Sequence, residues 1–439
     1  MIQVAIPCLA LVVALILYFK KPTLYLSFCL WVWFLAPFVR RLVDYRLGWQ
    51  DQSLILLSPH LVTAVAALSF VIPSSRRSGR VPGALLLCLA GAFYGFFVAM
   101  VVDPSAQAVY GLLNWVTPLF LAAHVALEVP HFEENRAVIM KTFLWAAGLL
   151  GVYGIYQFFV APPWDVYWLR NISEGLIDPS FGDPEPLKIR VWSTLNSPGT
   201  FSGVMMAALI FLLASTSALK VPFSVVGYLS FLLCVVRAAW LGWAVSLVVF
   251  LRKARPQVLV KVLASLIVSA MLLIPLVITL KDTVPVISER LATFSNLKQD
   301  ESFQERQDMY RSVAGIISHD PIGHGLKNQE VVGTVVVDSG ILITLLSLGW
   351  FGTAAYWAGI LIVTFRSGRP ATPDPFLTAC QAICVSTIAQ YVGANIFVSI
   401  GGVIFWLCTG AILAGNAAHQ RELTTTRDPL SLKPPLVAA

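Results

Sequence analysis

Long apolar runs constrain the fold of this chain more than any other feature of its sequence. They follow one another at about 2–19, 23–39, 54–72, 84–102, 106–127, 139–160, 199–218, 222–236, 238–251, 258–279, 338–365, 375–396 and 398–415. A helix of about 20 apolar residues spans the hydrocarbon core of a bilayer. Only 12% of the 439 residues are charged, against about 25% in soluble domains. Because the runs lack the alternation of barrel strands, we predict an all-α polytopic membrane protein with about 12–14 transmembrane helices.

The positions of Lys and Arg predict the direction in which the chain crosses the membrane, because basic residues gather in short cytoplasmic segments. An outer N-terminus and alternating runs put most basic clusters, such as Lys20-Lys21 and Arg252-Lys253, on the inner side. The short outer segments then hold only Arg40, Arg41, Arg46 and Arg237. The Arg40-Arg41 pair is the exception that this rule does not explain.

Two longer loops, at about 161–198 and 280–337, face outward in this arrangement. The second carries a charged segment with an amphipathic pattern over about 302–318, where Phe303, Met309, Val313 and Ile317 share one face. We therefore predict a membrane domain over residues 1–416 with two outer loops, the second partly helical. Residues 417–439 are polar and contain several prolines, which predicts a disordered cytoplasmic tail.

Four arginines are the candidate anion-binding residues. Arg237 interrupts an apolar stretch at the outer end of a span, where a charge is costly and usually has a functional partner. Arg190 precedes the Ser/Asn/Gly-rich start of another span, which favours an anion site. Arg306 and Arg311 lie in the charged outer segment. The alternative is that Arg237 and Arg190 are interfacial arginines and that the other two form a solvated helix face.

Asp338 and His324 are the candidate general bases. Asp338 lies where the second outer loop re-enters the membrane, and partial burial would raise its pKa toward a useful range. His324 lies between two glycines in a predicted turn that could place it over a ligand, although a surface histidine is the simpler interpretation. The sequence shows no pattern typical of a metal site or a phosphate-binding glycine loop, so we expect no metal and no cofactor. The net charge of +7 comes from clusters at span ends and does not predict a nucleic-acid partner.

Three segments resemble the O-antigen ligase/O-antigen polymerase family of bacterial envelope glycan enzymes. The first is Arg190-Val-Trp-Ser-Thr-Leu-Asn196-Ser-Pro-Gly199. The second is Val236-Arg237-Ala-Ala-Trp240. The third begins at Ser302-Phe-Gln-Glu-Arg306 and continues through Tyr310, Pro321, Gly323 and Gly325 to Asp338.

The resemblance implies a glycosyltransferase of the bacterial inner membrane that moves a glycan from an undecaprenyl-pyrophosphate carrier to an acceptor sugar. The arginines would stabilise the pyrophosphate leaving group, and Asp338 or His324 would activate the acceptor hydroxyl, with inversion. The nearby aromatic residues Trp164, Tyr167 and Trp168 could stack on sugar or lipid. Membrane lipid and a chain-length regulator or envelope assembly proteins are the further partners implied.

One departure from the family pattern affects the predicted reaction. Ligases of the family place a histidine at the position of Asp338, which favours a polymerase of O-antigen or exopolysaccharide repeat units. A ligase acting on a lipid or protein acceptor remains the first alternative. A transporter of lipid-linked glycan or a small anion is the second, although charges in outer loops are less typical of transporters than charges at the bilayer midplane.

Overall fold

The computed structural model describes residues 2–72, 81–172, 179–254, 256–279, 301–326, 331–332, 335–337, 339–367 and 374–427. Its α-helices are α1 (Ile2–Lys20), α2 (Pro22–Leu47), α3 (Ser58–Ala64), α4 (Gly83–Val102), α5 (Ala106–Leu127), α6 (Phe132–Val160), α7 (Pro163–Ile172), α8 (Pro198–Ala214), α9 (Lys220–Leu233), α10 (Arg237–Lys253), α11 (Pro256–Thr279), α13 (Glu301–His319), α14 (Gly340–Leu361), α15 (Pro375–Gln390) and α16 (Ser399–Arg427). The 3-10 helices are η1 (Leu54–Leu57), η2 (Val65–Phe70), η3 (Val129–His131) and η4 (Pro179–Phe181), and η7 (Ile362–Ser367) is a π-helix. The strands β1 (Val331–Val332) and β2 (Val335–Val336) form a small antiparallel hairpin.

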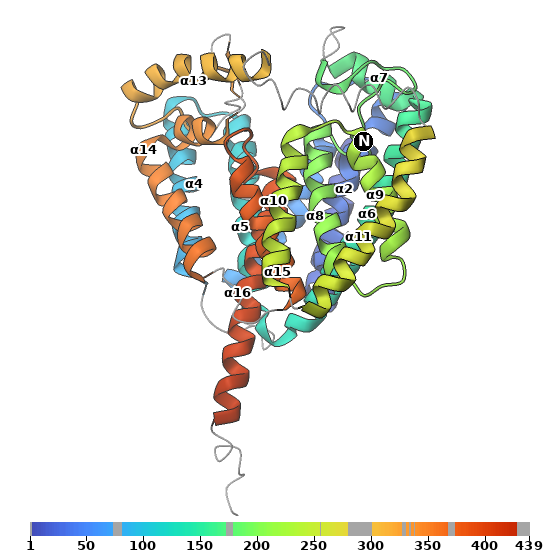
Figure 1. Ribbon diagram of the computed structural model, residues 1–439. Helices are drawn as coiled ribbons and strands as arrows, with labels where there is room; N and C mark the ends of the chain where they lie inside the picture. Colours follow the sequence, from blue (N-terminus) through green and yellow to red (C-terminus); the bar gives the residue numbers. More distant parts are fainter. Residues whose placement is uncertain are drawn as a thin grey trace, which may run out of the picture.

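The predicted all-α polytopic membrane class is confirmed. Within the described residues, seven helices are long and apolar enough to cross a membrane, and five shorter apolar helices have 10–17 residues. Together these are twelve candidates, at the lower end of the predicted range. The transmembrane helices stand side by side in one bundle, as Figure 1 shows.

The ends of the bundle differ in a way that fits the predicted orientation. In Figure 1 the N-terminus, α7 and α13 lie at one end, and α16 projects from the other. The two longer loops therefore share one end, which we call the outer end. The predicted tail begins at 417, but α16 continues to Arg427, so the first part of that tail is helical. Residues 428–439 lie outside the described part of the chain.

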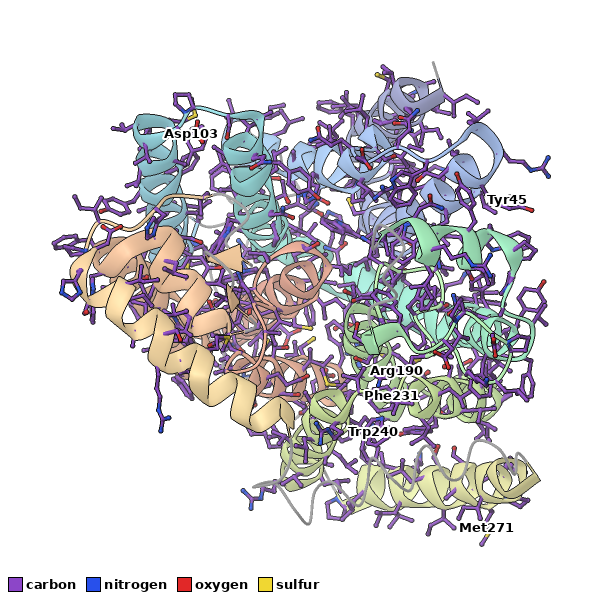
Figure 2. All side chains as sticks on the ribbon, turned by 90° about the horizontal axis from the view of Figure 1, so that it is seen from above. Tyr45, Asp103, Arg190, Phe231, Trp240 and Met271 are labelled. Carbon is purple, nitrogen blue, oxygen red and sulfur yellow. The ribbon has the colours of Figure 1, made fainter. Side chains whose placement is uncertain are left out.

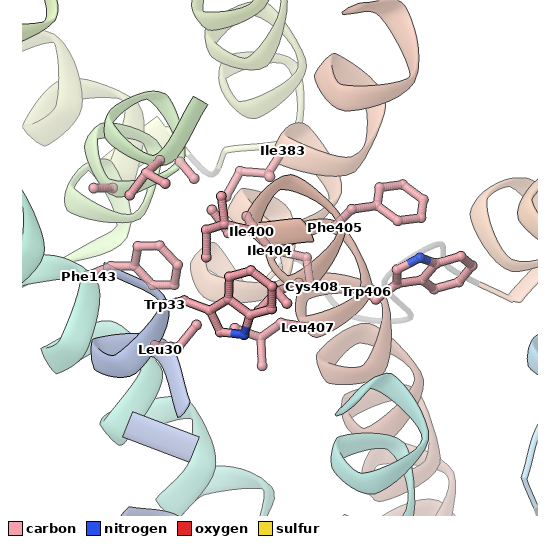
Figure 3. Packing of buried hydrophobic residues seen from close by; sticks show 14 of the residues in the cluster. Leu30, Trp33, Phe143, Ile383, Ile400, Ile404, Phe405, Trp406, Leu407 and Cys408 are labelled. Atoms are coloured by element: carbon pink, nitrogen blue, oxygen red, sulfur yellow. The ribbon is translucent and has the colours of Figure 1, made fainter. Parts of the chain in front are cut away.

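The core of the bundle is built from aromatic and aliphatic side chains of several helices. Trp33 of α2, Phe143 of α6, Ile383 of α15 and Ile404 of α16 meet in the close view of Figure 3. Burial of such side chains cannot drive association within lipid, so close packing has to hold the helices together. Small residues permit that packing, as at Gly91 of α4, where an added methyl group would crowd the backbone of α14.

The amphipathic helix predicted in the second outer loop is confirmed as α13. Its residues Met309, Val313 and Ile317 are buried and pack against α14. The side chain of Phe303 lies outside the described part of the structure. Figures 1 and 2 show α13 lying across the outer end of the bundle, from the α14 side toward α10.

A break in α14 holds the turn that follows α13. Gly349 has a φ of 60° and a ψ of −169° inside α14, a conformation almost restricted to glycine. The break releases backbone groups of α14, and the turn satisfies them. The amide of His324 donates to the Leu346 carbonyl at 2.7 Å, and the amide of Trp350 donates to the Pro321 carbonyl at 2.9 Å.

Replacement of Gly349 tests this break. Gly349→Ala should destabilise the protein by about 2 kcal/mol or more, because alanine strains this backbone conformation and its methyl group would overlap the Ile322 carbonyl. Thermal unfolding of the detergent-solubilised protein, followed by tryptophan fluorescence, measures the effect. Gly315→Ala in α13 is the control, since Gly315 has open space around it and should tolerate alanine without loss. Equal unfolding temperatures for both variants would contradict the proposed role of the break.

Candidate active site

The segment around Arg190 is fixed against the outer end of α9. The Arg190 amide donates to the Phe181 carbonyl at 2.8 Å, and its Nη1 donates to the Ser180 carbonyl at 3.1 Å. The next residue extends the link, because the amide of Val191 donates to the Leu233 carbonyl at 3.2 Å. Arg190 therefore lies where α9 ends and the chain turns toward α10.

Arg237 is the first residue of α10, directly after that turn. The turn is sharp, with Val235 at a φ of 55°. Viewed from the outer end, Arg190 lies close to Phe231 and Trp240, which flank the same turn (Figure 2). The backbone segment of Arg190 is thus bonded to the end of α9, four residues before Arg237.

A buried ion pair anchors the segment that follows Arg190. Arg41 of α2 and Asp165 of α7 are both almost fully buried, and Nη1 of Arg41 lies 2.7 Å from Oδ1 of Asp165. Nη2 of Arg41 also donates to the Ser193 carbonyl at 2.5 Å. One guanidinium therefore joins α2, α7 and the segment that follows Arg190.

Hydrogen bonds complete the surroundings of this pair. Asp165 accepts from Tyr153 at 2.8 Å and from Gln157 at 2.7 Å. The side-chain oxygen of Gln157 accepts in turn from the amides of Trp192 and Ser193, at 3.0 and 2.8 Å. Burial raises the pKa of Asp165, while the charge of Arg41 and these hydrogen bonds oppose that shift. Four polar side chains from α2, α6 and α7 thus form one network, and this network fixes the backbone that follows Arg190.

Aromatic rings enclose the Arg41 guanidinium. It lies about 6 Å from the ring centres of Phe38, Trp168 and Trp192, close enough for cation–π attraction. Trp168 is therefore part of the buried anchor and cannot stack on a ligand as the sequence suggested. Trp164 donates its indole N–H to the Tyr153 hydroxyl at 2.7 Å, and Tyr167 packs against Tyr45.

The candidate arginines of the second outer loop lie on α13. Tyr310 of α13 is bonded to the Ser339 hydroxyl at 2.5 Å and to the Val392 carbonyl at 3.2 Å. Arg311 follows Tyr310 and is exposed at the outer end. Arg306 lies on α13 one turn earlier, and its side chain lies outside the described part of the structure.

Asp338 itself lies outside the described residues, but both its neighbours are fixed. Val337 and Ser339 are buried, and the amide of Gly340 donates to the Tyr391 carbonyl at 3.0 Å. Gly340 therefore lies next to the outer end of α15.

Helix α15 contacts both α10, which begins at Arg237, and the chain at Gly340. Ser386 donates to the Gly242 carbonyl of α10 at 2.7 Å, so the two helices touch there. Arg237 lies five residues earlier on α10, about 7 Å further outward at 1.5 Å per residue. Tyr391, which binds Gly340, lies five residues later on α15. Arg237 and the segment around position 338 thus approach the outer end of α15 from two sides.

His324 lies apart from this group. Its turn is held between α4 and α14, since the amide of Leu326 donates to the Gly95 carbonyl at 3.0 Å. Its Nε2 lies 3.6 Å from the carboxylate of Asp320 in the same turn. Among the described residues, the segments of Arg190 and Arg237 are thus linked through the end of α9, and His324 lies at the α4–α14 side.

Comparison with known proteins identifies the segment that carries most of these residues. Residues 222–357 match the family model described as O-antigen ligase. Over this segment the chain is similar to the O-antigen ligase/polymerase family. No curated protein matches the chain in a sequence search. The match covers the second and third motifs and bears out the resemblance. It supports, in general, a membrane glycosyltransferase of the ligase or polymerase type.

The O-antigen ligase segment covers less than half of the chain. It contains Arg237, the helix α13 with Arg306 and Arg311, the His324 turn and position 338. Arg190 and the buried pair of Arg41 and Asp165 precede it. The helices before 222 thus supply the framework that holds Arg190 beside the O-antigen ligase segment.

Sequence reasoning missed the Arg41–Asp165 pair, although a signal was present. Arg40 and Arg41 were the exception to the charge rule, and both are held at the outer end by tertiary contacts. Nε of Arg40 lies 3.1 Å from Asp44, and its Nη2 donates to the Gln50 carbonyl at 2.9 Å. An unexplained charge at a span end was therefore the sign of a buried partner, but the sequence could not name Asp165.

Breaking the buried pair tests its structural role. Arg41→Leu should cost about 3–5 kcal/mol, because it leaves the Asp165 carboxylate buried without a counter-charge. The folded yield and the unfolding temperature of purified protein measure this loss. Arg41→Leu combined with Asp165→Leu should recover part of it, and Arg46→Leu, on the exposed end of the same helix, is the control. If the single and double variants were equally unstable, the ion pair would not be the cause.

Proposed function

We propose that this protein polymerises O-antigen or exopolysaccharide repeat units at the outer face of the bacterial inner membrane. The donor is a glycan on an undecaprenyl-pyrophosphate carrier, and the acceptor is a hydroxyl of another glycan. The observation that carries the proposal is the hydrogen bond from the amide of Val191, next to Arg190, to the carbonyl of Leu233, four residues before Arg237, within the O-antigen ligase segment. A lipid carrier diffuses in the bilayer, so its pyrophosphate reaches the protein at this level.

The arginines suit the leaving group of this reaction. The acceptor oxygen bonds to the anomeric carbon, and the bond from that carbon to the pyrophosphate oxygen breaks, so the lipid pyrophosphate leaves with the electron pair. A guanidinium donates paired hydrogen bonds to phosphate oxygens and neutralises the charge that develops on them. We assign this role to Arg190 and Arg237, assisted by Arg306 or Arg311 from α13, without a metal. Attack from the face opposite the leaving group inverts the anomeric carbon.

A general base has to take the proton of the acceptor hydroxyl. We assign this role to Asp338, because Gly340, two residues later, is bonded to the outer end of α15, and α15 also contacts α10. His324 is the weaker candidate, since its imidazole faces Asp320 on the α4–α14 side. Position 338 also separates two reactions within the family, because ligases carry histidine there.

Transfer to a lipid acceptor is the second candidate function. The matching family model is described as O-antigen ligase, and this observation favours a ligase. Both reactions use a donor on the same carrier and release the same leaving group, but the polymerase consumes single repeat units and the ligase consumes long chains. The length of the glycan that accumulates without the protein separates them.

Removal of Arg237 tests the transfer reaction. In cells that lack the protein, Arg237→Ala should fail to restore glycan transfer, and undecaprenyl-linked glycan should accumulate to at least about tenfold the wild-type level, as expected for a lost transition-state contact. Mass spectrometry of extracted lipid-linked glycans measures the pool. Single repeat units in the pool indicate a polymerase, and long chains indicate a ligase.

Arg252→Ala is the matched control for this experiment. Arg252 is an exposed arginine at the inner end of the same helix, so its loss should leave the pool at the wild-type level. Membrane abundance of each variant is measured by immunoblot. A normal pool with Arg237→Ala at normal abundance would reject the proposed function, and a transport role would then be examined by flux into proteoliposomes.

The identity of the base is tested by two further variants. Asp338→Asn should lower the rate of glycan transfer by about 10²–10⁴-fold, because the amide cannot accept the proton. His324→Gln should retain most of the activity. Turnover is measured with purified protein in nanodiscs and lipid-linked donor extracted from the deficient strain. The opposite result, with loss only in His324→Gln, would transfer the role to His324.

A further inference from the structure

A large cavity lies at the inner end of the bundle, opposite the candidate active site. It has a volume of about 350 Å³, and ligand sites usually have about 300–1,000 Å³. Its walls are the first turns of α6, the end of α8, the turn of residues 215–217 and Phe376 at the start of α15. In Figure 1 this is the end of the bundle from which α16 projects. The cavity therefore lies on the inner side of the membrane, far from Arg190 and Arg237.

One face of α6 places three charged side chains along this cavity. Glu133, Arg136 and Lys141 line it at helical spacing, over about two turns. Arg136 is also held by the opposite wall. Its Nη1 lies 3.0 Å from Oδ2 of Asp374, and its guanidinium lies 5.9 Å from the ring centre of Phe376. The cavity is therefore a built gap between α6 and the start of α15, bridged by a fixed arginine.

The charges left over for a ligand are one cation and one anion. The pair of Arg136 and Asp374 is neutral in itself, and the nearby Lys220 donates to the end of α8 at 3.2 Å. Lys141 forms no ion pair within the part of the chain that the structure describes. Glu133 reaches Arg136 only at 3.4 Å with a side chain that is 75% exposed, a contact that contributes little. A ligand with one phosphate and one ammonium group matches this set, whereas a purely anionic ligand would leave Glu133 without a partner.

The turn between α8 and α9 adds neutral donors across from α6. Ser215, Thr216 and Ser217 all line the cavity. The Ser215 hydroxyl accepts from the amide of Ser217, and the Ser217 hydroxyl accepts from the amide of Leu219, both at 3.2 Å. Because these oxygens act as acceptors within the turn, each O–H is left to donate outward. Hydroxyl donors beside a lysine and an arginine suit the oxygens of a phosphate group.

An apolar stripe continues from the cavity along α6 toward the middle of the membrane. Trp145, Leu149 and Val152 follow Lys141 at intervals of four, four and three residues, so the four side chains share one face of the helix. The three apolar residues are 38%, 52% and 56% exposed. Acyl chains attached to a phosphate at Lys141 would lie along this stripe, whereas a soluble phosphate compound would leave it unused. The stripe therefore favours a phospholipid.

We propose that this cavity binds the headgroup of an inner-leaflet phospholipid that carries a primary ammonium group, such as phosphatidylethanolamine. Lys141, Arg136 and the hydroxyls of residues 215–217 bind its phosphate, and Glu133 accepts from its ammonium. Lys141 lies eight residues deeper on α6 than Glu133, about 12 Å at 1.5 Å per residue. Ammonium and phosphate thus follow the order that they have in an inner leaflet, with the ammonium nearer to water. The lipid joins α6 to the turn after α8, and this role is independent of the proposed transfer reaction.

Lipid binding to the full chain tests this proposal. Delipidated protein in detergent is titrated with dioleoyl phosphatidylethanolamine or dioleoyl phosphatidylglycerol, and native mass spectrometry measures the bound fraction. The ethanolamine lipid should bind at least about fivefold more tightly, because only its headgroup offers a partner to Glu133. Lys141→Ala should weaken its binding at least about tenfold through the loss of a charge-assisted hydrogen bond to phosphate. Glu133→Gln should bring the two lipids to within about twofold of each other, because the carboxylate that discriminates between them is gone.

Soluble competitors and a control variant complete the test. Glycerophosphoethanolamine and inorganic phosphate should not displace the lipid, because they lack the acyl chains that lie along α6. Lys20→Ala replaces an exposed lysine at the end of α1 and should leave binding unchanged. Glu133 and Lys141 are exposed as well, so their variants should fold. Tighter binding of phosphatidylglycerol, displacement by inorganic phosphate, or equal binding by wild type and Lys141→Ala would overturn the proposal.

Discussion

The buried pair of Arg41 and Asp165 is the interaction on which the outer end of this protein depends. Removing two charges from water is expensive, and hydrophobic replacements of such pairs often stabilise a fold. The pair is therefore better explained by the geometry that it fixes than by the free energy that it adds. A guanidinium has several donors in one plane, so Arg41 binds Asp165 and the Ser193 carbonyl together. Gln157 then holds two consecutive amides of the same segment.

This anchor fixes the position of the segment from Arg190 to Asn196 relative to the end of α9. The segment from Arg190 to Asn196 is an irregular stretch between α7 and α8, which would otherwise adopt many conformations. Once it is tied to α2, α6 and α7, Val191 can bond to the end of α9, and Arg190 lies beside the turn that carries Arg237. A cationic site for a lipid pyrophosphate requires two such arginines at a constant separation, because preorganised charge is what lowers the barrier.

The second outer loop is held by hydrogen bonds to a break in α14 and by the packing of α13. The break at Gly349 frees backbone groups of α14, and the turn around His324 satisfies them. The apolar face of α13 covers α14, and Tyr310 fastens the helix to Ser339 beside position 338. The O-antigen ligase segment thus carries its outer loop as a packed element above the bundle.

The sequence by itself determined the all-α membrane class, the amphipathic helix α13 and the family, because hydropathy, periodicity and short motifs are local properties of the chain. It also indicated Arg190 and Arg237, since a charge at a span end is visible in the sequence. Only the tertiary structure decided that Asp165 is the partner of Arg41 and that Trp168 is buried. These contacts join residues far apart in the chain, such as Arg41 and Ser193. Their pairing depends on how the helices pack, and no local pattern encodes it.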